Sequence, residues 1–517
     1  MSTAHSTNNT NTLELDQSQQ HIAQQHTKKR RAIIAALLTL VIVLSTCFGV
    51  WWTAGDGSNI MANLIKPAAK PANVAARNAT VSFAYRSAPH FLAPSTLNTT
   101  DTNNTNATTS TDSTDNADNT SSTTDRANTT STVTTGDHKG NVNYSPISLW
   151  MALSMLEQGA GGQTRAQMTK LLSDPNALVS TLSSDDYQSL LRAVNGRYSG
   201  SQSEMDMHNS VWIDDNYQLT DSFRTMSKDA FHADIQSLQF NDAAATRMED
   251  WITKHVHGML KPSLKLNNDT MLSVINTVYA DGRWKSPFDP EFTEEDTFHG
   301  TNGDNTVPMM EQTFNSMVWT HDENDTWQRV SIPFDNGGAL TILLPQDGHF
   351  DEIAGSEEKL LWAMSTCLNR GENGTTAGGY ACAADSAAGM GVSAEPMTVF
   401  VRMPRFSINN TFASDDIRAI LESLGMTDAF DATKADFSTM VERRSSSENI
   451  FLSQIVQGTT IEVNEHGAKA SAFTQASIDS AGAPLENIAE FIVDRPFIYE
   501  YDTPDGVPLF IGAVRNL

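Results

Sequence analysis

The sequence predicts an α+β fold. Three observations support this class: several segments have the spacing of amphipathic helices, others alternate like strands, and the two kinds of segment do not alternate strictly along the chain. A chain of 517 residues is long enough for one large domain or for several smaller ones.

The predicted elements follow in chain order from an early helix. Helices are expected where apolar residues recur at helical spacing, at residues 78–92, 148–158, 163–172, 185–198, 220–231 and 243–257. Strands are expected where β-type patterns occur, at residues 206–213, 270–280, 329–334 and 339–344. The last two strands form a predicted hairpin around Asn336-Gly337-Gly338.

The N-terminal region predicts a membrane anchor. Residues 1–27 are polar, residues 28–31 are all Lys or Arg, and residues 32–52 form an apolar run long enough to cross a bilayer. The basic residues place the N-terminus in the cytoplasm and the following domain outside the cell. A cleaved signal peptide, which would give a secreted protein, is the alternative. The expected organisation is a disordered tail at 1–31, a single-pass anchor at 32–52 and a tether at 53–76.

Two irregular segments read as insertions. Residues 94–137 are rich in Thr, Asn, Ser and Asp and carry almost no apolar side chains, so they cannot bury a core. Residues 369–396 are rich in Gly and Ala. Cys367 precedes this second segment and Cys382 lies inside it, on the expected outer side of the membrane, where disulfides persist, so they form either a disulfide or two free thiols.

Composition and motifs exclude several classes of function. The net charge is −27, and Lys and Arg are scarce outside residues 28–31, so we expect no nucleic-acid partner. The sequence lacks the nucleophile, metal-protease and phosphate-loop motifs. We therefore expect no enzymatic activity, metal, cofactor or small-molecule ligand.

Residues 461–485 combine a strand with an unusual run of small side chains. Ile461 and Val463 alternate with polar neighbours, as in a half-buried strand. From Ala468 onward every second side chain is small and mostly apolar, whereas the intervening side chains are mostly polar. The run contains no proline before Pro484, so it could join a sheet. Taken alone, it could also be a linker or a marginal helix.

The flanks of this run resemble the serpin family. Glu465-His466-Gly467-Ala468 is similar to the serpin hinge. Other matching motifs occur in the family's order, at residues 141–148 (NVNYSPIS), 276–288 (NTVYADGRWKSPF), 307–310 (VPMM), 403–406 (MPRF), 435–438 (ADFS), 491–497 (FIVDRPF) and 508–514 (PLFIGAV). The resemblance runs from about residue 77 to residue 517, and we expect a bacterial, membrane-anchored member.

The resemblance implies a fold with about nine helices, three β-sheets, a large central sheet A and an exposed reactive-centre loop at residues 465–485. It also implies a suicide-substrate inhibitor, which a serine protease cleaves and which then traps the protease covalently as the loop inserts into sheet A. The implied hinge residues are Glu465, Gly467, Ala468, Ala470, Ala472 and Thr474. The resemblance further pairs Glu465 with Arg405, and it places Trp284 and Asn276 at the mouth where the loop enters.

The family's spacing places the cleaved bond at Ala481–Gly482, with Ser480–Ala481 as the alternative. Small residues there, and the scarcity of Lys and Arg nearby, favour an elastase-like or subtilisin-like target over a trypsin-like one. The expected partner is that protease, and the inhibitor is expected to be a monomer. The other possible function is that of a non-inhibitory serpin-fold protein that binds or adheres at a surface. Small residues at the inward hinge positions favour inhibition.

Overall fold

The computed structural model describes residues 68–93, 139–177, 181–198, 201–264, 266, 270–365, 392–412, 414–443, 449–468 and 488–517. The chain divides into two compact units, Met1–Lys66 and Pro67–Leu517, and all of these residues belong to the second. The predicted tail and anchor, the insertion at 94–137, Cys367, Cys382 and the loop after Ala468 lie outside the described residues. Within them, no helix is both long and apolar enough to span a membrane.

Nine α-helices occur in the described ranges. They are α3 (Val74–Leu92), α4 (Pro146–Gly159), α5 (Gly162–Leu172), α6 (Ser184–Asn195), α7 (Asp221–Phe231), α8 (Asp242–His255), α9 (Phe350–Ala354), α10 (Glu357–Ser365) and α12 (Ser414–Ser423). Side-chain caps fix several helix starts, because the side chains of Ser183, Thr220 and Asn241 accept hydrogen bonds from backbone N–H groups of the first turn. Among the described residues the first helix is α3, which begins at Val74, so the last three residues of the predicted tether at 53–76 are helical.

The strands form three sheets among the described residues. The six-stranded sheet, here called sheet A, has the order β11-β13-β14-β5-β2-β4. Its strands are β11 (Phe406–Phe412), β13 (Gln454–Asn464), β14 (Gly467–Ala468), β5 (Leu272–Arg283), β2 (Glu204–Asp214) and β4 (Asp234–Leu238). A two-stranded sheet pairs β3 (Tyr217–Leu219) with β12 (Val441–Arg443).

The nine-stranded sheet has the order β1-β17-β16-β9-β8-β7-β10-β15, and β6 also pairs with β7. Its strands are β1 (Val142–Tyr144), β6 (Glu294–Gly300), β7 (Gly303–Asp322), β8 (Trp327–Pro333), β9 (Ala339–Pro345), β10 (Val392–Pro404), β15 (Ile488–Ile492), β16 (Phe497–Asp502) and β17 (Pro508–Val514). The predicted insertion at 369–396 ended five residues too late. Residues 392–396 belong to β10 and pair with β7, because strand pairing outweighed the weak local pattern.

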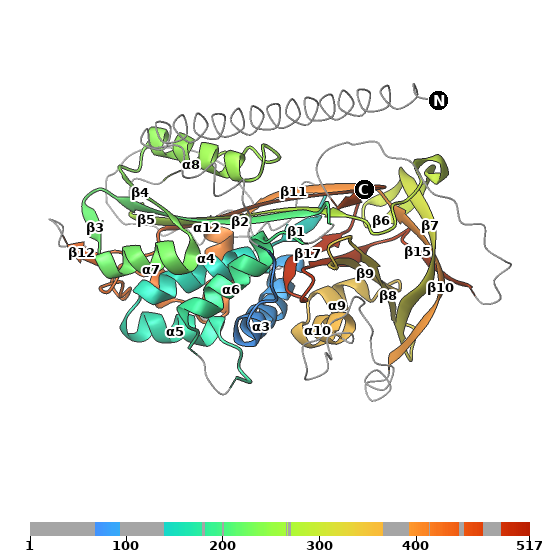
Figure 1. The fold of residues 1–517 in the computed structure, drawn as a ribbon, viewed down its shortest axis with the longest axis horizontal. Helices are drawn as coiled ribbons and strands as arrows, with labels where there is room; N and C mark the ends of the chain where they lie inside the picture. Colours follow the sequence, from blue (N-terminus) through green and yellow to red (C-terminus); the bar gives the residue numbers. More distant parts are fainter. Residues whose placement is uncertain are drawn as a thin grey trace, which may run out of the picture. The chain divides into compact units, whose positions relative to one another are not determined.

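Sheet A separates two hydrophobic clusters. The larger one contains Val274 and Val278 of β5 together with most of α4, and the smaller one joins α8 to Ile275 of the same strand. Because successive side chains of a strand point to opposite faces, α8 covers one face of sheet A and α4 lies on the other. Figure 1 shows this layering, with α8 above β4, β5 and β2 and the other helices below them.

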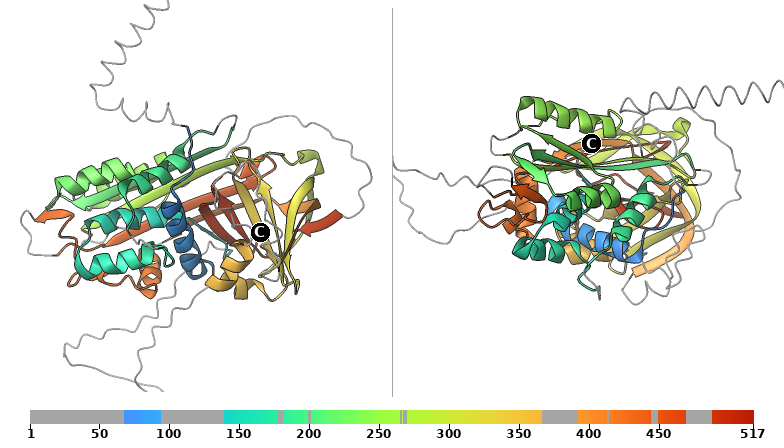
Figure 2. Two further views of the ribbon diagram at one scale, coloured as in Figure 1. Left: turned by 60° about the horizontal axis from the view of Figure 1, so that its bottom comes forward. Right: turned by 60° about the vertical axis from the view of Figure 1, so that its left-hand side comes forward.

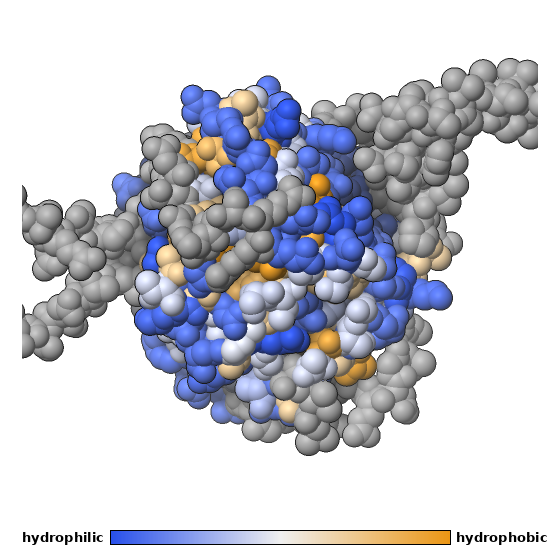
Figure 3. Space-filling view, turned by 90° about the vertical axis from the view of Figure 1, so that its left-hand side faces the viewer, coloured by the Kyte–Doolittle hydropathy of each residue, from blue (hydrophilic) through white to orange (hydrophobic). Residues whose placement is uncertain are grey.

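The remaining helices and strands gather at different ends of the described unit. Figure 2 shows α4, α5 and α6 together at one end and the strands β7–β10 at the other. On the face drawn in Figure 3, apolar side chains are scattered among hydrophilic ones.

Candidate functional site

The central feature of sheet A is an incomplete contact between β5 and β13. The two strands pair in parallel from Ser273↔Gln454 to Asn276↔Gln457. At their other ends the two-residue strand β14 lies between them and pairs with both. Among the described strand residues, 277–281 of β5 and 458–462 of β13 are not paired with each other. We call this unpaired stretch the slot, and its end at Asn276 and Gln457 the fork.

The other end of the slot, the mouth, is formed by a tight turn. After β13 the chain turns at Glu465 and His466 and returns as β14. Trp284 holds this turn at two points, because its backbone N–H donates to His466 O (3.1 Å) and its indole Nε1–H donates to Asn464 O (2.9 Å). Trp284 also stacks on Phe334, with ring centroids 4.9 Å apart. The structure therefore places Trp284 at the mouth, where the resemblance placed it.

Glu465 anchors the turn through its carboxylate. Arg405 Nε donates to Glu465 Oε1 at 2.7 Å, the Arg405 guanidinium makes a second contact with the same oxygen, and Thr293 Oγ1 donates to it at 2.6 Å. The Glu465 side chain is only 5% exposed. Burial alone would raise the pKa of Glu465, but the hydrogen bonds from Arg405 and Thr293 outweigh it and hold the pKa below its usual value. The carboxylate is therefore ionised at neutral pH, and the implied pairing with Arg405 is present.

Glycines allow β14 to lie against β5. A β-carbon on Gly467 would overlap the carbonyl oxygen of Gly282, so this crossing requires glycine. Gly282 also lacks room for a side chain, because a β-carbon there would overlap the Tyr501 hydroxyl and the Phe334 ring. Ala468, the next residue, is buried and pairs with Val463 and Gly282.

Polar side chains hold the fork on the α4 side of the sheet. Gln457 Nε2 donates to Ser145 O (2.8 Å), and Ser145 N–H donates to Gln457 Oε1 (3.2 Å). Asn276 Nδ2 donates to Asn209 Oδ1 at 2.5 Å. These bonds fix both strands at the point where they separate.

The placement of Asn276 at the mouth was wrong. Asn276 and Trp284 lie eight positions apart along the same extended segment, a distance of roughly 26 Å at about 3.3 Å per residue. Gln457, Asn209 and Thr293 were not predicted as site residues. Their neighbours gave a partial signal in the sequence. Ser145, which bonds Gln457, lies in the 141–148 motif, and Gly282 of β5 lies in the 276–288 motif.

The remaining predicted site residues lie outside the described residues. They are Ala470, Ala472, Thr474, Ser480, Ala481 and Gly482, together with Cys367 and Cys382. In the part of the chain that the structure describes, no group of three or more His, Cys, Asp or Glu side chains is arranged to hold a metal ion.

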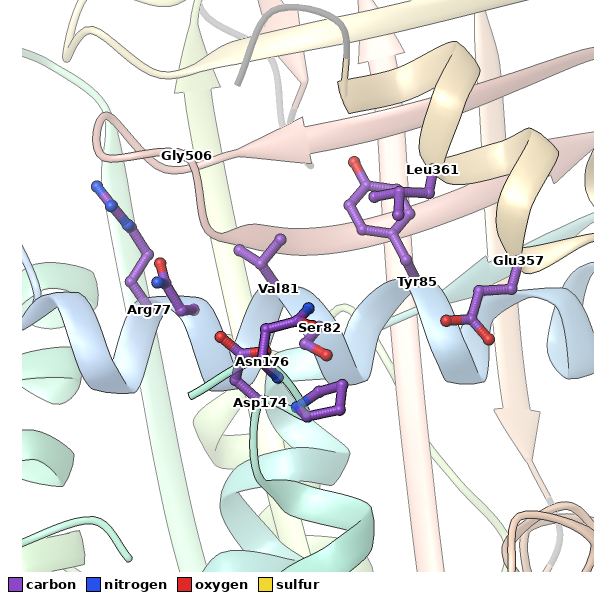
Figure 4. A pocket seen from close by; sticks show the side chains of 11 residues that line it. Arg77, Val81, Ser82, Tyr85, Asp174, Asn176, Glu357, Leu361 and Gly506 are labelled. Atoms are coloured by element: carbon purple, nitrogen blue, oxygen red, sulfur yellow. Dashed lines mark hydrogen bonds between the residues drawn. The ribbon is translucent and has the colours of Figure 1, made fainter. Parts of the chain in front are cut away.

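A hollow of about 290 Å³ lies away from the mouth, beside α3. Figure 4 shows Arg77, Val81 and Tyr85 of α3 on one side of it and Glu357 and Leu361 of α10 on another. The described residues that line it include both charge signs, and none of them belongs to the mouth or the fork.

Comparison with known proteins identifies relatives of this arrangement. A family model described as "Serpin (serine protease inhibitor)" matches residues 127–517. Serpin-Z2B of Triticum aestivum is 29% identical over 402 residues, covering 73% of this chain and 90% of the relative. Plasminogen activator inhibitor 1 of Bos taurus is 28% identical over 387 residues, covering 73% and 87%.

Solved structures show the same fold. The thermophilic serpin tengpin in its native state matches with a TM-score of 0.61 at 22% identity, covering 88% of this chain and 98% of that chain. Native protease nexin-1 with heparin matches with a TM-score of 0.56 at 25% identity, covering 73% and 93%. Because the family model covers most of the sequence, and because the sheet with its slot lies within the matched residues, the chain belongs to the serpin family.

Proposed function

We propose that this protein inhibits serine proteases as a suicide substrate, by inserting its cleaved loop into the slot of sheet A. The observation that carries the proposal is the register of the hinge. Ala468 already lies between Val463 of β13 and Gly282 of β5, at the mouth of a stretch where these strands are not paired with each other. The first step of an added strand is therefore present in the uncleaved protein.

The register predicts where each following residue would pair. Val463 and Gly282 differ by 463 − 282 = 181 positions, and the fork pairs differ by the same amount, since 454 − 273 = 181. An inserting strand would thus meet both neighbours in register without any sliding of β13 along β5. Continuing from Ala468, Ala470 would pair with Ala280 and Ile461, and Ala472 with Val278 and Thr459.

Thr474 would then reach the fork, between Asn276 and Gln457. The same register points Ala470, Ala472 and Thr474 toward the α4 side, because side chains alternate along a strand and Ala468 is buried on that side. Small side chains there add volume to a packed core at low cost, whereas larger ones would overpack it. This fit favours an inhibitor over a non-inhibitory serpin-fold protein.

Insertion has enough driving force to disable a protease. About a dozen added strand residues contribute roughly 6–18 kcal/mol, at ~0.5–1.5 kcal/mol per backbone hydrogen bond. The protease attacks the loop and forms an acyl-enzyme. Moving a catalytic group by about 1 Å costs roughly a hundredfold in rate, so dragging the attached protease along the sheet would stop deacylation.

The target is an elastase-like or subtilisin-like protease, cleaving at Ala481–Gly482 or at Ser480–Ala481. Small side chains at these positions suit a shallow specificity pocket. Lys469 is the only Lys or Arg between His466 and Arg495, which disfavours a trypsin-like target. The similarity to plasminogen activator inhibitor 1 supports protease inhibition in general. The class of target protease is inferred from the sequence of the loop alone.

Incubation with pancreatic elastase tests the proposal. We expect an SDS-stable band at the summed mass of protease and inhibitor less the C-terminal peptide, and release of that peptide, which begins at Gly482 or Ala481. Trypsin is the comparison protease and is expected to form little covalent complex. Cleavage of the loop by elastase and by subtilisin without any covalent band would instead favour the non-inhibitory surface-binding function.

We also propose that residues 32–52 anchor the inhibitor in the cell membrane, with the serpin domain outside. The apolar length and the preceding basic residues support this placement. Retention of the full-length chain in the membrane pellet after an alkaline carbonate wash would support the anchor. Release of a shortened chain into the medium would support cleavage and secretion.

A further inference from the structure

A row of polar side chains crosses one face of the nine-stranded sheet. Antiparallel pairing places Glu500 of β16 opposite Thr341 of β9, and Thr341 opposite Ser331 of β8. Directly opposite residues point to the same face, and so do residues two apart on one strand, which adds Asp502 and Arg329 to the row. The Ser331 and Thr341 hydroxyls form a hydrogen bond of 2.8 Å. We call these five residues the seam.

Two helices cover the seam. The Tyr85 hydroxyl of α3 donates to Glu500 Oε2 at 2.8 Å. Arg329 Nη1 donates to the Ala363 carbonyl oxygen, in the last turn of α10. The charged members of the seam are shielded from solvent, because Arg329, Glu500 and Asp502 are only 1%, 4% and 5% exposed. Helix α10 is therefore bound to the same guanidinium that attracts the two buried carboxyl groups.

The charges of the seam do not balance when both carboxyl groups are ionised. Burial lowers the pKa of Arg329 only to about 10, so it supplies one positive charge at neutral pH. Two carboxylates would then leave one uncompensated negative charge in the interior, which is strongly destabilising. Tyr85, the other titratable group that faces Glu500 among the described residues, stays neutral, because burial raises the pKa of its hydroxyl.

A proton on the carboxyl pair restores the balance. Burial and then the neighbouring Asp502 raise the pKa of Glu500 well above its usual value. The Glu500 and Asp502 side chains also hydrogen-bond to each other, and two carboxyl groups can do so only when one of them carries a proton. With that proton in place, the seam holds one negative and one positive charge.

We infer that Glu500 and Asp502 share one proton against Arg329, and that loss of this proton releases α10 from the nine-stranded sheet. Two ionised carboxylates would draw the guanidinium toward themselves, which weakens its hydrogen bond to the Ala363 carbonyl. Water must also reach the new buried charge, and a covering helix has to move to admit it. The seam thus couples the docking of α10 to pH.

Helix α10 is the cover that gives way. It has nine residues, and its Leu361 is 38% exposed, whereas α3 has 19 residues and buries eleven of them. The hollow of about 290 Å³ borders both helices, and Figure 4 shows Leu361 of α10 facing it together with Val81 and Tyr85 of α3. An outward movement of α10 enlarges this existing space. None of the seam residues belongs to the mouth or the fork, so the inference does not rest on the proposed function.

Hydrogen–deuterium exchange of the intact chain at a series of pH values tests the coupling. Rates are corrected for the intrinsic pH dependence of exchange, and the protection of residues 357–365 is compared with that of residues 74–92. Because opening releases one proton, we expect the protection of α10 to fall about tenfold per pH unit between about pH 5 and pH 8. The protection of α3 should stay constant over the same range.

Glu500→Gln and Asp502→Asn test whether the proton is shared. Each variant leaves a single carboxylate facing Arg329, so no proton is needed and the pH dependence of α10 protection should disappear in both. Thr341→Val is the matched control, because it alters the seam between β8 and β16 without changing its charge. This control should keep the tenfold dependence. Infrared spectra at neutral pH should show a protonated-carboxyl band in wild type that both carboxyl variants lack.

The inference is overturned if the protection of α10 in the wild-type protein does not depend on pH, or if α3 loses protection in parallel with α10. Retention of the full dependence by either Glu500→Gln or Asp502→Asn would show that the two carboxyl groups do not share the proton. Loss of the dependence in Thr341→Val as well would show that it reports packing and not charge. If neither carboxyl variant folds, the wild-type comparison of α10 with α3 decides alone.

Discussion

Gly467 crosses Gly282 so closely that a β-carbon on Gly467 would overlap the carbonyl oxygen of Gly282. This contact lets β14 enter the mouth of the slot, and it fixes the register from which the pairing of every later loop residue follows.

Gly467→Ala should therefore weaken the hinge. The added methyl group would overlap the Gly282 carbonyl, and relief requires a backbone shift that costs about 1–3 kcal/mol of stability. We expect a lower thermal midpoint for the intact protein and a larger fraction of inhibitor cleaved without trapping elastase. Calorimetry and the ratio of complex to cleaved inhibitor measure the two effects. An unchanged midpoint and ratio would show that β14 is not fixed at this crossing.

The Glu465–Arg405 ion pair predicts a dependence of stability on pH. The folded-state pKa of Glu465 lies below its unfolded value, so its stabilising effect is present at neutral pH and is lost as pH falls below about 4.5 through the folded-state pKa. Glu465→Gln should lower the free energy of unfolding at pH 7 by about 1.5–3 kcal/mol, the range for hydrogen bonds to charged groups. The difference from wild type should shrink toward pH 3 in denaturant titrations.

Arg405→Lys is the conservative comparison for this pair. Lysine keeps the positive charge but cannot make two contacts through a planar guanidinium, so an intermediate loss of stability is expected. Equal stability of all three proteins at pH 7 would contradict a structural role of the ion pair.

A second acidic site predicts the opposite dependence on pH. Glu500 is buried beneath α3 and accepts a hydrogen bond from the Tyr85 hydroxyl at 2.8 Å. Burial and then the neighbouring Asp502 raise the pKa of Glu500 well above its usual value. The unfolded chain loses this proton first as pH rises above about 4.5, so the contribution of Glu500 to stability falls with increasing pH.

Glu500→Gln removes that titration while keeping the size of the side chain. We expect the stability of the variant to rise relative to wild type between pH 5 and pH 8, as measured by urea unfolding at each pH. Glu291→Gln, at an exposed position, is the control and should leave the pH profile of wild type unchanged. A wild-type profile for Glu500→Gln would show that the carboxyl is ionised in the folded protein.

The sequence predicts elements well where the signal is local, and less well where distant segments meet. Helices such as α5 and α7 lie within about two residues of their predicted limits, because caps and periodicity are local features. The fork was not predicted, because Gln457 and Ser145 are 312 residues apart and their double hydrogen bond leaves no local pattern. Asn276 was misplaced for a related reason, since its motif runs along a strand that reaches from the fork to the mouth.

The alternation of the hinge predicts different effects for neighbouring substitutions. On insertion, the register set by Ala468 would turn Ala470 toward the buried side of sheet A and Ser471 toward the outer side, opposite Tyr279 and Thr460. Ala470→Arg would bury an unpaired charge and should convert the inhibitor into a substrate that elastase cleaves without a covalent complex. Ser471→Arg is the matched control and should retain most of the SDS-stable complex. A stable complex with Ala470→Arg would refute the register of the hinge.

Cleavage of the loop should stabilise the whole domain, because the inserted strand would pair with both β5 and β13 along the slot. If insertion contributes even 5–10 kcal/mol, the thermal midpoint should rise by about 15–30 °C after cleavage near residue 481. The comparison is made by calorimetry on intact and nicked wild-type protein. Ala470→Arg protein nicked at the same bond is the control and should gain little, since its chain is cut but cannot enter the slot. A wild-type midpoint that stays unchanged after cleavage would mean that the unpaired stretch between β5 and β13 does not accept the loop, and the proposed inhibition would then have no driving force.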